Sequence, residues 1–310
     1  MEMQEFFDMV KEALEARGLT GISVEQSNVI KNNGVMQMGV TLVRPGESIS
    51  PNIYIEPFYR DFLKGRSIFD IADDIIRQSE AAKEQISFNI GDFTDFEKAS
   101  KRIVFKLINR EKNERLLEQI PFCPYMDLAM VFYYLLPEKD EDKNKGGQGG
   151  FATILIHNTH LAMWKVTEEQ IARVARENTP GLLPAAIVGM GELLSQMTHH
   201  VEIPGEVLES RGMYVLSNDI RMNGAAAMAY PDIVGRFADS LGKNIYIIPS
   251  SIHEVILVPE TGEERGLNAM VCEVNRMQLD PKEVLADHVY YYDRKEGKMT
   301  GVLCEKTEYC

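Results

Sequence analysis

The chain has 310 residues, of which 45% are hydrophobic, and it carries 33 Lys and Arg against 47 Asp and Glu. This composition is that of a globular protein and excludes a disordered chain, a collagen and a disulfide scaffold. The net charge of −14 comes from both halves, with 19 basic and 25 acidic residues in 1–150 and 14 and 22 in 151–310, and such a field repels nucleic acid and anionic membranes.

The first half of the chain shows both helical and strand-like patterns. Apolar residues at three- and four-residue steps predict an amphipathic helix over residues 3–17, ended by Gly18. A β-like stretch from Ile22 to Leu42 is centred on Asn32-Asn33-Gly34, which supplies the positive φ angles of a hairpin turn. Further predicted elements are a strand at Asn52–Glu56, a helix from Ile68 to Ser79, a helix start at Thr94–Glu97, a strand at Arg102–Ile108, and two strands buried on both faces at Leu128–Leu136 and Phe151–Ile156.

The second half interleaves helices and strands without regular βαβ alternation. A capping box at Thr167–Gln170 predicts a helix that ends before Asn178-Thr179-Pro180, and a second helix is predicted over Pro184–Met197. The remaining predicted elements are strands at Met213–Ser217, Asn244–Ile248 and His253–Val258, helices at Pro231–Leu241 and Asn268–Leu279, and a hairpin of Val289–Tyr292 and Met299–Leu303. The predicted fold class is therefore α+β, with mixed, mostly antiparallel sheets and packed helices.

A charged and glycine-rich segment, residues 138–150, follows the buried strand that ends at Leu136. It is either a flexible linker or the long loop of a hairpin. Because the chain is longer than a single core usually grows, we expect an N-terminal α+β lobe of residues 1–137 and a C-terminal α+β lobe of residues 151–310, with one continuous fold as the alternative.

Several features indicate a cytoplasmic protein. The N-terminus has acidic residues where a signal peptide needs basic ones, and the longest uncharged run, residues 146–164, is too polar to span a membrane. Four cysteines, at 123, 272, 304 and 310, are scattered without a C-x-x-C pair, as expected of reduced thiols. Together with the acidic net charge, these features predict no nucleic-acid partner and no membrane partner. We also expect no cofactor.

Six phrases together resemble a family signature: Lys31–Gly34, Ile49–Tyr54, Asp127–Leu136, Tyr214–Asn218, Gly224–Ala226 and Ile248–Glu254. They resemble an uncharacterised domain-of-unknown-function family of gut Gram-positive bacteria over most of the chain. The stretch from Thr167 to Val258 is more distantly similar to another uncharacterised bacterial family. The resemblance implies a cytoplasmic bacterial protein and supplies no residue roles.

The strongest local candidate for chemistry is the polar segment Pro249-Ser250-Ser251-Ile252-His253-Glu254 between two apolar strands. If the segment is extended, the two-residue period places Ser251 and His253 on one face, where the imidazole would act as the base for a serine nucleophile and Asp219 would orient it. The alternative is structural: Pro and Ser satisfy backbone groups at a hairpin turn while His253 and Glu254 make buried hydrogen bonds.

A second candidate lies at the end of the strand that precedes it. Asn218 and Asp219 follow the strand, and Asn223-Gly224-Ala225-Ala226 introduces small residues where free backbone N–H groups could hold an anion or small ligand. Capping and close packing explain the same residues. Because both strands are predicted to be neighbours, Asn218, Asp219, Asn223 and Ser250 are candidate ligand-binding residues beside Ser251, His253 and Glu254.

Metal chemistry is not expected. His157 and His160 share a face only if their segment is helical, His199-His200 direct their rings apart, and Leu257 stands where a zincin motif beginning at His253 needs its second histidine. Two functions therefore remain open: a module that binds a protein or small ligand, and a hydrolase or transferase that uses His253 as acid and base with Ser251 or Ser250 nearby.

Overall fold

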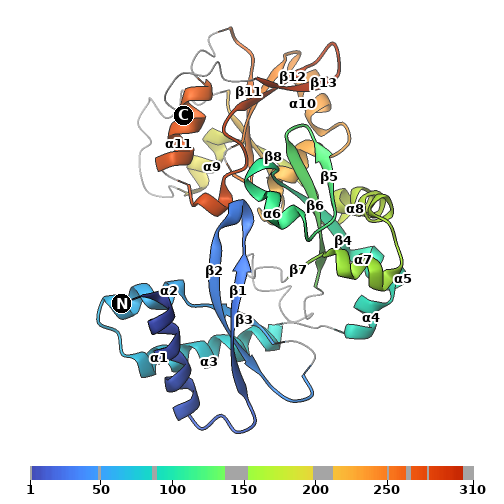
Figure 1. Cartoon of the computed structure of the whole chain (residues 1–310). Helices are drawn as coiled ribbons and strands as arrows, with labels where there is room; N and C mark the ends of the chain where they lie inside the picture. Colours follow the sequence, from blue (N-terminus) through green and yellow to red (C-terminus); the bar gives the residue numbers. More distant parts are fainter. Residues whose placement is uncertain are drawn as a thin grey trace. The chain divides into compact units, whose positions relative to one another are not determined.

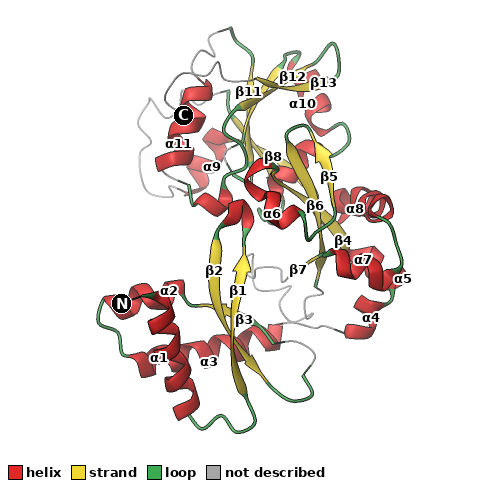
Figure 2. Cartoon of the chain, viewed as in Figure 1, coloured by secondary structure: helices red, strands yellow, loops and turns green. Residues whose placement is uncertain are grey.

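The computed structural model describes residues 2–47, 50–85, 89–136, 153–197, 212–249, 251–262, 267–277 and 279–302. Contacts divide the chain into two compact units, residues 1–94 with 135–153 and residues 95–134 with 154–310. Helices and sheets occur in both (Figures 1 and 2), and every strand pair with a described register is antiparallel. The α+β class predicted from the sequence is confirmed.

The first unit is a three-stranded sheet, ordered β1-β2-β3, with helices packed on it. Its elements are α1 (Met3–Ala16), β1 (Ser23–Ile30), the 3₁₀ turn η1 (Asn32–Gly34), β2 (Met36–Val43), β3 (Asn52–Tyr54), α2 (Glu56–Leu63), α3 (Ile68–Gln85) and α4 (Ile90–Thr94). The predicted hairpin is confirmed, and Asn33 and Gly34 adopt φ of 59° and 71° at its turn. Helix α2 was not predicted.

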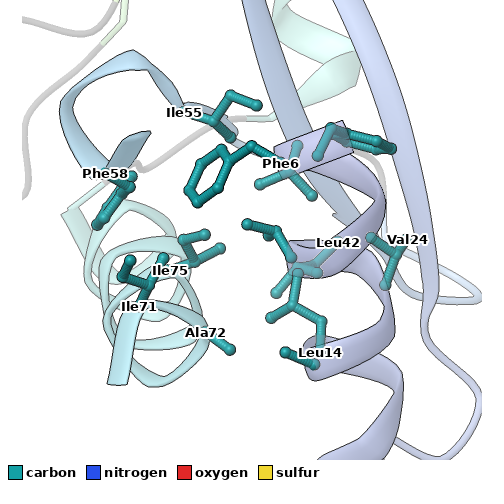
Figure 3. Packing of buried hydrophobic residues seen from close by; sticks show 13 residues of the cluster. Phe6, Leu14, Val24, Leu42, Ile55, Phe58, Ile71, Ala72 and Ile75 are labelled. Carbon is teal, nitrogen blue, oxygen red and sulfur yellow. The ribbon is translucent and has the colours of Figure 1, made fainter. Parts of the chain in front are cut away.

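The core of this unit forms between α1, α3 and the sheet (Figure 3). Phe6 and Leu14 of α1, Leu42 of β2 and Ile75 of α3 are each at most 1% exposed. Burial of one such side chain stabilises the fold by roughly 1.5–3 kcal/mol. The apolar residues that predicted the helix over residues 3–17 are thus among the residues that form this core.

The second unit contains a four-stranded sheet in which β6 is central. Its strands are β4 (Ile103–Asn109), β5 (Phe122–Tyr125), β6 (Leu128–Leu135) and β7 (Thr153–Leu155), and the nearby helices are α5 (Phe96–Ala99), α6 (Glu114–Leu117), α7 (Asn158–Trp164) and α8 (Glu168–Leu182). Helix α8 packs along β4, where the Phe105 N–H donates to Thr179 Oγ1 over 3.0 Å. The predicted strands at β4 and β6 are confirmed.

A six-stranded sheet, ordered β13-β12-β10-β11-β9-β8, completes the second unit. Its strands are β8 (Ala185–Gly189), β9 (Tyr214–Asn218), β10 (Ile245–Ile248), β11 (Val255–Pro259), β12 (Val289–Asp293) and β13 (Lys298–Val302), accompanied by α9 (Met190–Met197), the 3₁₀ segment η6 (Gly224–Ala229), α10 (Ile233–Leu241) and α11 (Leu267–Met277). Gly242 ends α10 at φ 67°, as predicted.

Three element predictions were wrong. The helix predicted over Pro184–Met197 is strand β8 followed by helix α9, because Ala185–Gly189 finds a ladder partner in β9. Helix α8 continues through Pro180, which lies in its last turn, where the missing N–H costs one hydrogen bond. Strand β7 is partly exposed and is therefore not the doubly buried strand that its composition suggested.

The segment 138–150 lies outside the described residues. Strand β7, which follows it, pairs with β6, which precedes it. Pairing of the two flanking strands is what the hairpin alternative requires, whereas a linker between lobes requires no such pairing.

Candidate functional site

The β10–β11 loop carries most of the residues that the sequence singled out. Strand β11 pairs with β10 on one side and with β9 on the other, which places His253 beside the end of β9 at Asn218. Strand β11 begins at Val255, two residues later than predicted, so His253 and Glu254 lie in the loop. The extended backbone on which a shared face of Ser251 and His253 depended is therefore not present there. Ser250 lies outside the described residues.

Three hydrogen bonds fix the loop to β9 and to the residues that follow it, and a fourth lies within the loop itself. The Asn223 N–H donates to Nδ1 of His253 over 3.2 Å, and Ser217 Oγ donates to the His253 carbonyl over 2.8 Å. The Ala225 N–H donates to the Ile252 carbonyl over 3.2 Å. Finally, the His253 N–H donates to Ser251 Oγ over 3.0 Å. Two loops distant in sequence thus form one polar cluster.

Gly224 is required for this close approach. A Cβ atom at Gly224 would lie 2.1 Å from Ser217 Oγ, 2.6 Å from the Asn218 backbone nitrogen and 2.6 Å from the His253 carbonyl oxygen. Two of these neighbours are backbone atoms of strand β9 and of the loop, which cannot rotate away. The small residues noted in the sequence therefore serve packing at this position.

Asn218 and Asp219 differ in their burial and in their hydrogen bonds. Asn218 is 1% exposed, and its side-chain amide donates to the Met222 carbonyl over 2.8 Å and accepts from the Met222 N–H over 3.1 Å. Asp219 is exposed, and its backbone N–H donates to Pro184. The Asn218 amide thus closes the turn, and no described hydrogen bond joins Asp219 to the imidazole.

Ser251 and His253 meet through the backbone. Ser251 is 7% exposed, and its hydroxyl oxygen accepts the His253 N–H, which is a hydrogen bond typical of a turn. Among the described residues, no hydrogen bond joins Ser251 Oγ to the imidazole. The arrangement therefore lacks the nucleophile–base contact of a serine triad.

The environment of His253 favours a neutral imidazole. Burial is the main cause that lowers the pKa of His253; Glu283 and Glu254 oppose the shift, while Lys106 and Lys282 add to it. Because Nδ1 accepts the Asn223 N–H, we assign the proton of the neutral ring to Nε2 from the hydrogen-bond pattern. His253 thus presents a donor at Nε2.

Tyr133 of β6 lies next to this cluster. The sequence did not indicate it as a site residue, because its position in the apolar run Leu128–Leu136 is typical of an ordinary strand residue. Tyr133 is 2% exposed, and its hydroxyl has no hydrogen-bond partner within the described ranges. Burial raises the pKa of Tyr133, and a side-chain contact from Asn223 that falls outside normal hydrogen-bond geometry opposes the rise. A buried orphan hydroxyl of this kind costs free energy.

A ligand-sized cavity of about 580 Å³ lies between α8 and β5. One face of α8 supplies most of its wall, and Cys123 and Pro231 complete it. The α8 residues recur at steps of three, four and seven: Glu169, Ala172, Arg173, Arg176, Glu177 and Pro180. That spacing marks one helical face in the sequence, but only the fold shows that β5 and Pro231 turn this face into a pocket, which we call the α8 pocket.

The histidines at 157 and 160 have a capping role. His157 is the N-cap of α7, and its backbone N–H donates to His160 Nδ1 over 3.0 Å. Burial lowers the pKa of both. No group of three His, Cys, Asp or Glu side chains in the described ranges is arranged to hold a metal ion. His199-His200 lies outside those ranges.

Every helix with a described course is too short or too polar to cross a membrane. Fold and sites together define an α+β protein whose second unit, in its described part, has a ligand-sized cavity and a polar loop cluster. The chain belongs to the family of unknown function DUF5688, whose model matches residues 3–294. Comparisons with curated proteins and with solved structures found no match.

Proposed function

We propose that this protein is a binding module for a small molecule and that its ligand occupies the α8 pocket. The observation that carries the proposal is the cavity itself, since about 580 Å³ falls within the range of roughly 300–1,000 Å³ that is usual for ligand sites. Ala172, Pro180 and Pro231 supply apolar surface, and charged side chains of α8 stand beside them. That mixture is typical of small-molecule sites.

The test uses four aromatic probes of similar size: benzoate, phenyl phosphate, benzamide and benzyl alcohol. Binding to the full chain is measured by ligand-observed NMR before and after alkylation of Cys123 with N-ethylmaleimide. Cys123 lines the pocket, so the adduct should fill it and abolish binding. The Cys123→Ser protein, treated identically, should retain binding.

Two results would contradict the proposal. Either no probe binds, or a bound probe remains after the wild-type pocket has been alkylated. Because burial raises the pKa of Cys123, the alkylation is run at pH 8.5 and its extent at Cys123 is measured by peptide mass spectrometry.

A hydrolase or transferase is the second candidate, supported by one observation at His253. A lowered pKa keeps its imidazole neutral near pH 7, and a base at His253 would have to release the Asn223 N–H from Nδ1, because Nε2 carries the proton. In this proposal His253 is the acid and base, with Ser251, Ser250 and Glu254 nearby. Turnover of ester, amide or phosphoryl substrates that is lost in His253→Gln but kept in His288→Gln would support it.

The cytoplasmic location of the protein is also a proposal. Cys123 and Cys272 are free thiols within the described ranges, which is consistent with a reducing cytoplasm. The resemblance to a family of gut Gram-positive bacteria supports the same location, and cell fractionation of the native organism tests it.

A further inference from the structure

We infer that the α8 pocket takes an organic anion, a small molecule that presents one carboxylate or phosphate group to Arg173 and Arg176 and rests its apolar part on Ala172, Pro180 and Pro231. This inference rests on the proposed function, because it names the ligand class of the same pocket.

The two arginines are placed to share one anion. They are three residues apart on α8, and both line the cavity. Side chains at this spacing are neighbours on a helix surface, with Cβ atoms about 5–6 Å apart. Each guanidinium presents a planar fork of donors that matches the two oxygens of a carboxylate or phosphate.

Neither arginine is ion-paired in the described part of the fold, and Arg176 hydrogen-bonds Cys123 of the pocket wall. No ion pair within the described ranges joins Arg173 or Arg176 to a carboxylate. The smaller cavity of the first unit, about 400 Å³, offers a contrast, because its Arg66 is ion-paired with both Asp61 and Asp74. In a chain of net charge −14, two arginines without carboxylate partners at one cavity favour an anionic ligand.

The acidic residues of the same face limit the charge of that ligand. Glu169 is engaged at the start of α8, where a hydrogen bond from Thr167 is the main cause that lowers its pKa. Glu177 is exposed at the cavity. Two carboxylates beside two guanidinium groups leave the pocket wall with no net charge, so a ligand with a single anionic group fits better than a polyanion.

Cys123 provides a reporter inside the pocket. Burial raises the pKa of its thiol, and Arg176 opposes that rise through its charge and a hydrogen bond. An anion bound at Arg176 should weaken this influence. It should therefore slow alkylation of Cys123 both by covering the thiol and by reducing its thiolate fraction.

The experiment measures dissociation constants by calorimetry on the full chain, with benzoate, phenyl phosphate, the neutral isostere benzamide and inorganic tripolyphosphate. We expect benzoate or phenyl phosphate to bind at least about 10-fold more tightly than benzamide, the usual scale for a charged hydrogen bond. The tighter of the two identifies the ligand's group as carboxylate or phosphate. Tripolyphosphate should bind more weakly than the tighter aromatic anion.

Three variants locate the effect. Arg173→Gln and Arg176→Gln should each weaken binding of that anion roughly 10-fold, and Arg176→Lys should fall between Gln and wild type because it keeps the charge and loses the fork. Arg60→Gln, an exposed position on α2 of the first unit, is the matched control and should leave binding unchanged. Raising salt from 50 to 300 mM should weaken binding of the anion and leave benzamide unaffected.

The failures of the two proposals are distinguishable. If benzamide binds as tightly as the anions, or if both Gln variants bind the anion like wild type, the anion inference is overturned while the pocket still binds small molecules. If tripolyphosphate binds most tightly, the ligand class is wrong. If no aromatic probe binds, the proposed function fails together with the inference.

Discussion

The backbone N–H of Asn223 donates a hydrogen bond to Nδ1 of His253 across 3.2 Å, joining the turn after β9 to the loop before β11. This bond requires an imidazole that is unprotonated at Nδ1. Protonation of the ring would place a second donor against the Asn223 N–H, so the loop packing and the ionisation of His253 are coupled.

The first prediction concerns pH. The pKa of His253 in the fold is lowered below its ordinary value of 6.5, so between the two values the unfolded chain binds more protons than the folded chain. The free energy of unfolding should therefore be highest above pH 6.5 and should fall as the pH decreases through that window. His157 and His160 act in the same direction.

His253→Asn isolates the contribution of His253, since the Asn side-chain oxygen can still accept the Asn223 N–H. Urea unfolding at pH 7.5, 6.5 and 5.5 should give a smaller pH dependence for this variant than for wild type. An unchanged slope would show that the folded state does not disfavour protonated His253.

The second prediction concerns Gly224. Gly224→Ala should destabilise the fold by about 1–3 kcal/mol, the range for overpacking. The reason is that the Cβ atom of the new alanine would overlap Ser217, Asn218 and His253. Gly181→Ala is the control: Gly181 lies within α8, and nothing lies within 4 Å of its added Cβ. That change should be neutral or stabilise by up to about 1 kcal/mol. Equal midpoints of thermal unfolding for the two variants would contradict the close approach.

The third prediction concerns Thr179, which is fully buried where α8 meets β4. Its hydroxyl accepts the Phe105 N–H and donates to the Ala175 carbonyl. Thr179→Val keeps the shape and leaves the Phe105 N–H without a partner, so chemical denaturation should show a loss of about 1–3 kcal/mol. Thr94→Val, an exposed hydroxyl that bonds only within its own helix turn, should cost less than about 0.5 kcal/mol.

Where the sequence predicted structure well, the signal was local. Helix α1 repeats its apolar residues at helical spacing and ends before Gly18, and the β1–β2 hairpin has Asn33 and Gly34 at the two positions that need positive φ. Ala185–Gly189 has no such local signal. It is a strand because β9 pairs with it, and that partner is more than 20 residues away in the sequence.

The candidate site likewise has features that the sequence can predict and features that it cannot. Proximity of Asn218 to His253 follows from neighbouring strands, which periodicity can suggest. The α8 pocket, in contrast, depends on which face of α8 meets β5, and the orphan hydroxyl of Tyr133 depends on the absence of a partner across the packed interface. Both are properties of tertiary contacts that no pattern within one segment contains.

The last prediction tests that orphan hydroxyl. Tyr133→Phe removes a buried O–H that has no partner among the described residues, so the free energy of unfolding should not fall and can rise by up to about 1 kcal/mol.

Tyr230 is the matched control. It is 5% exposed, and its hydroxyl donates to the Leu183 carbonyl over 3.0 Å. Tyr230→Phe should therefore cost about 1 kcal/mol or more, because it also leaves that carbonyl unpaired. Urea unfolding of both variants at pH 7.5 measures the difference. If Tyr133→Phe were the more damaging change, the Tyr133 hydroxyl would have to be hydrogen-bonded in solution, and the polar cluster around Asn223 would then extend to β6.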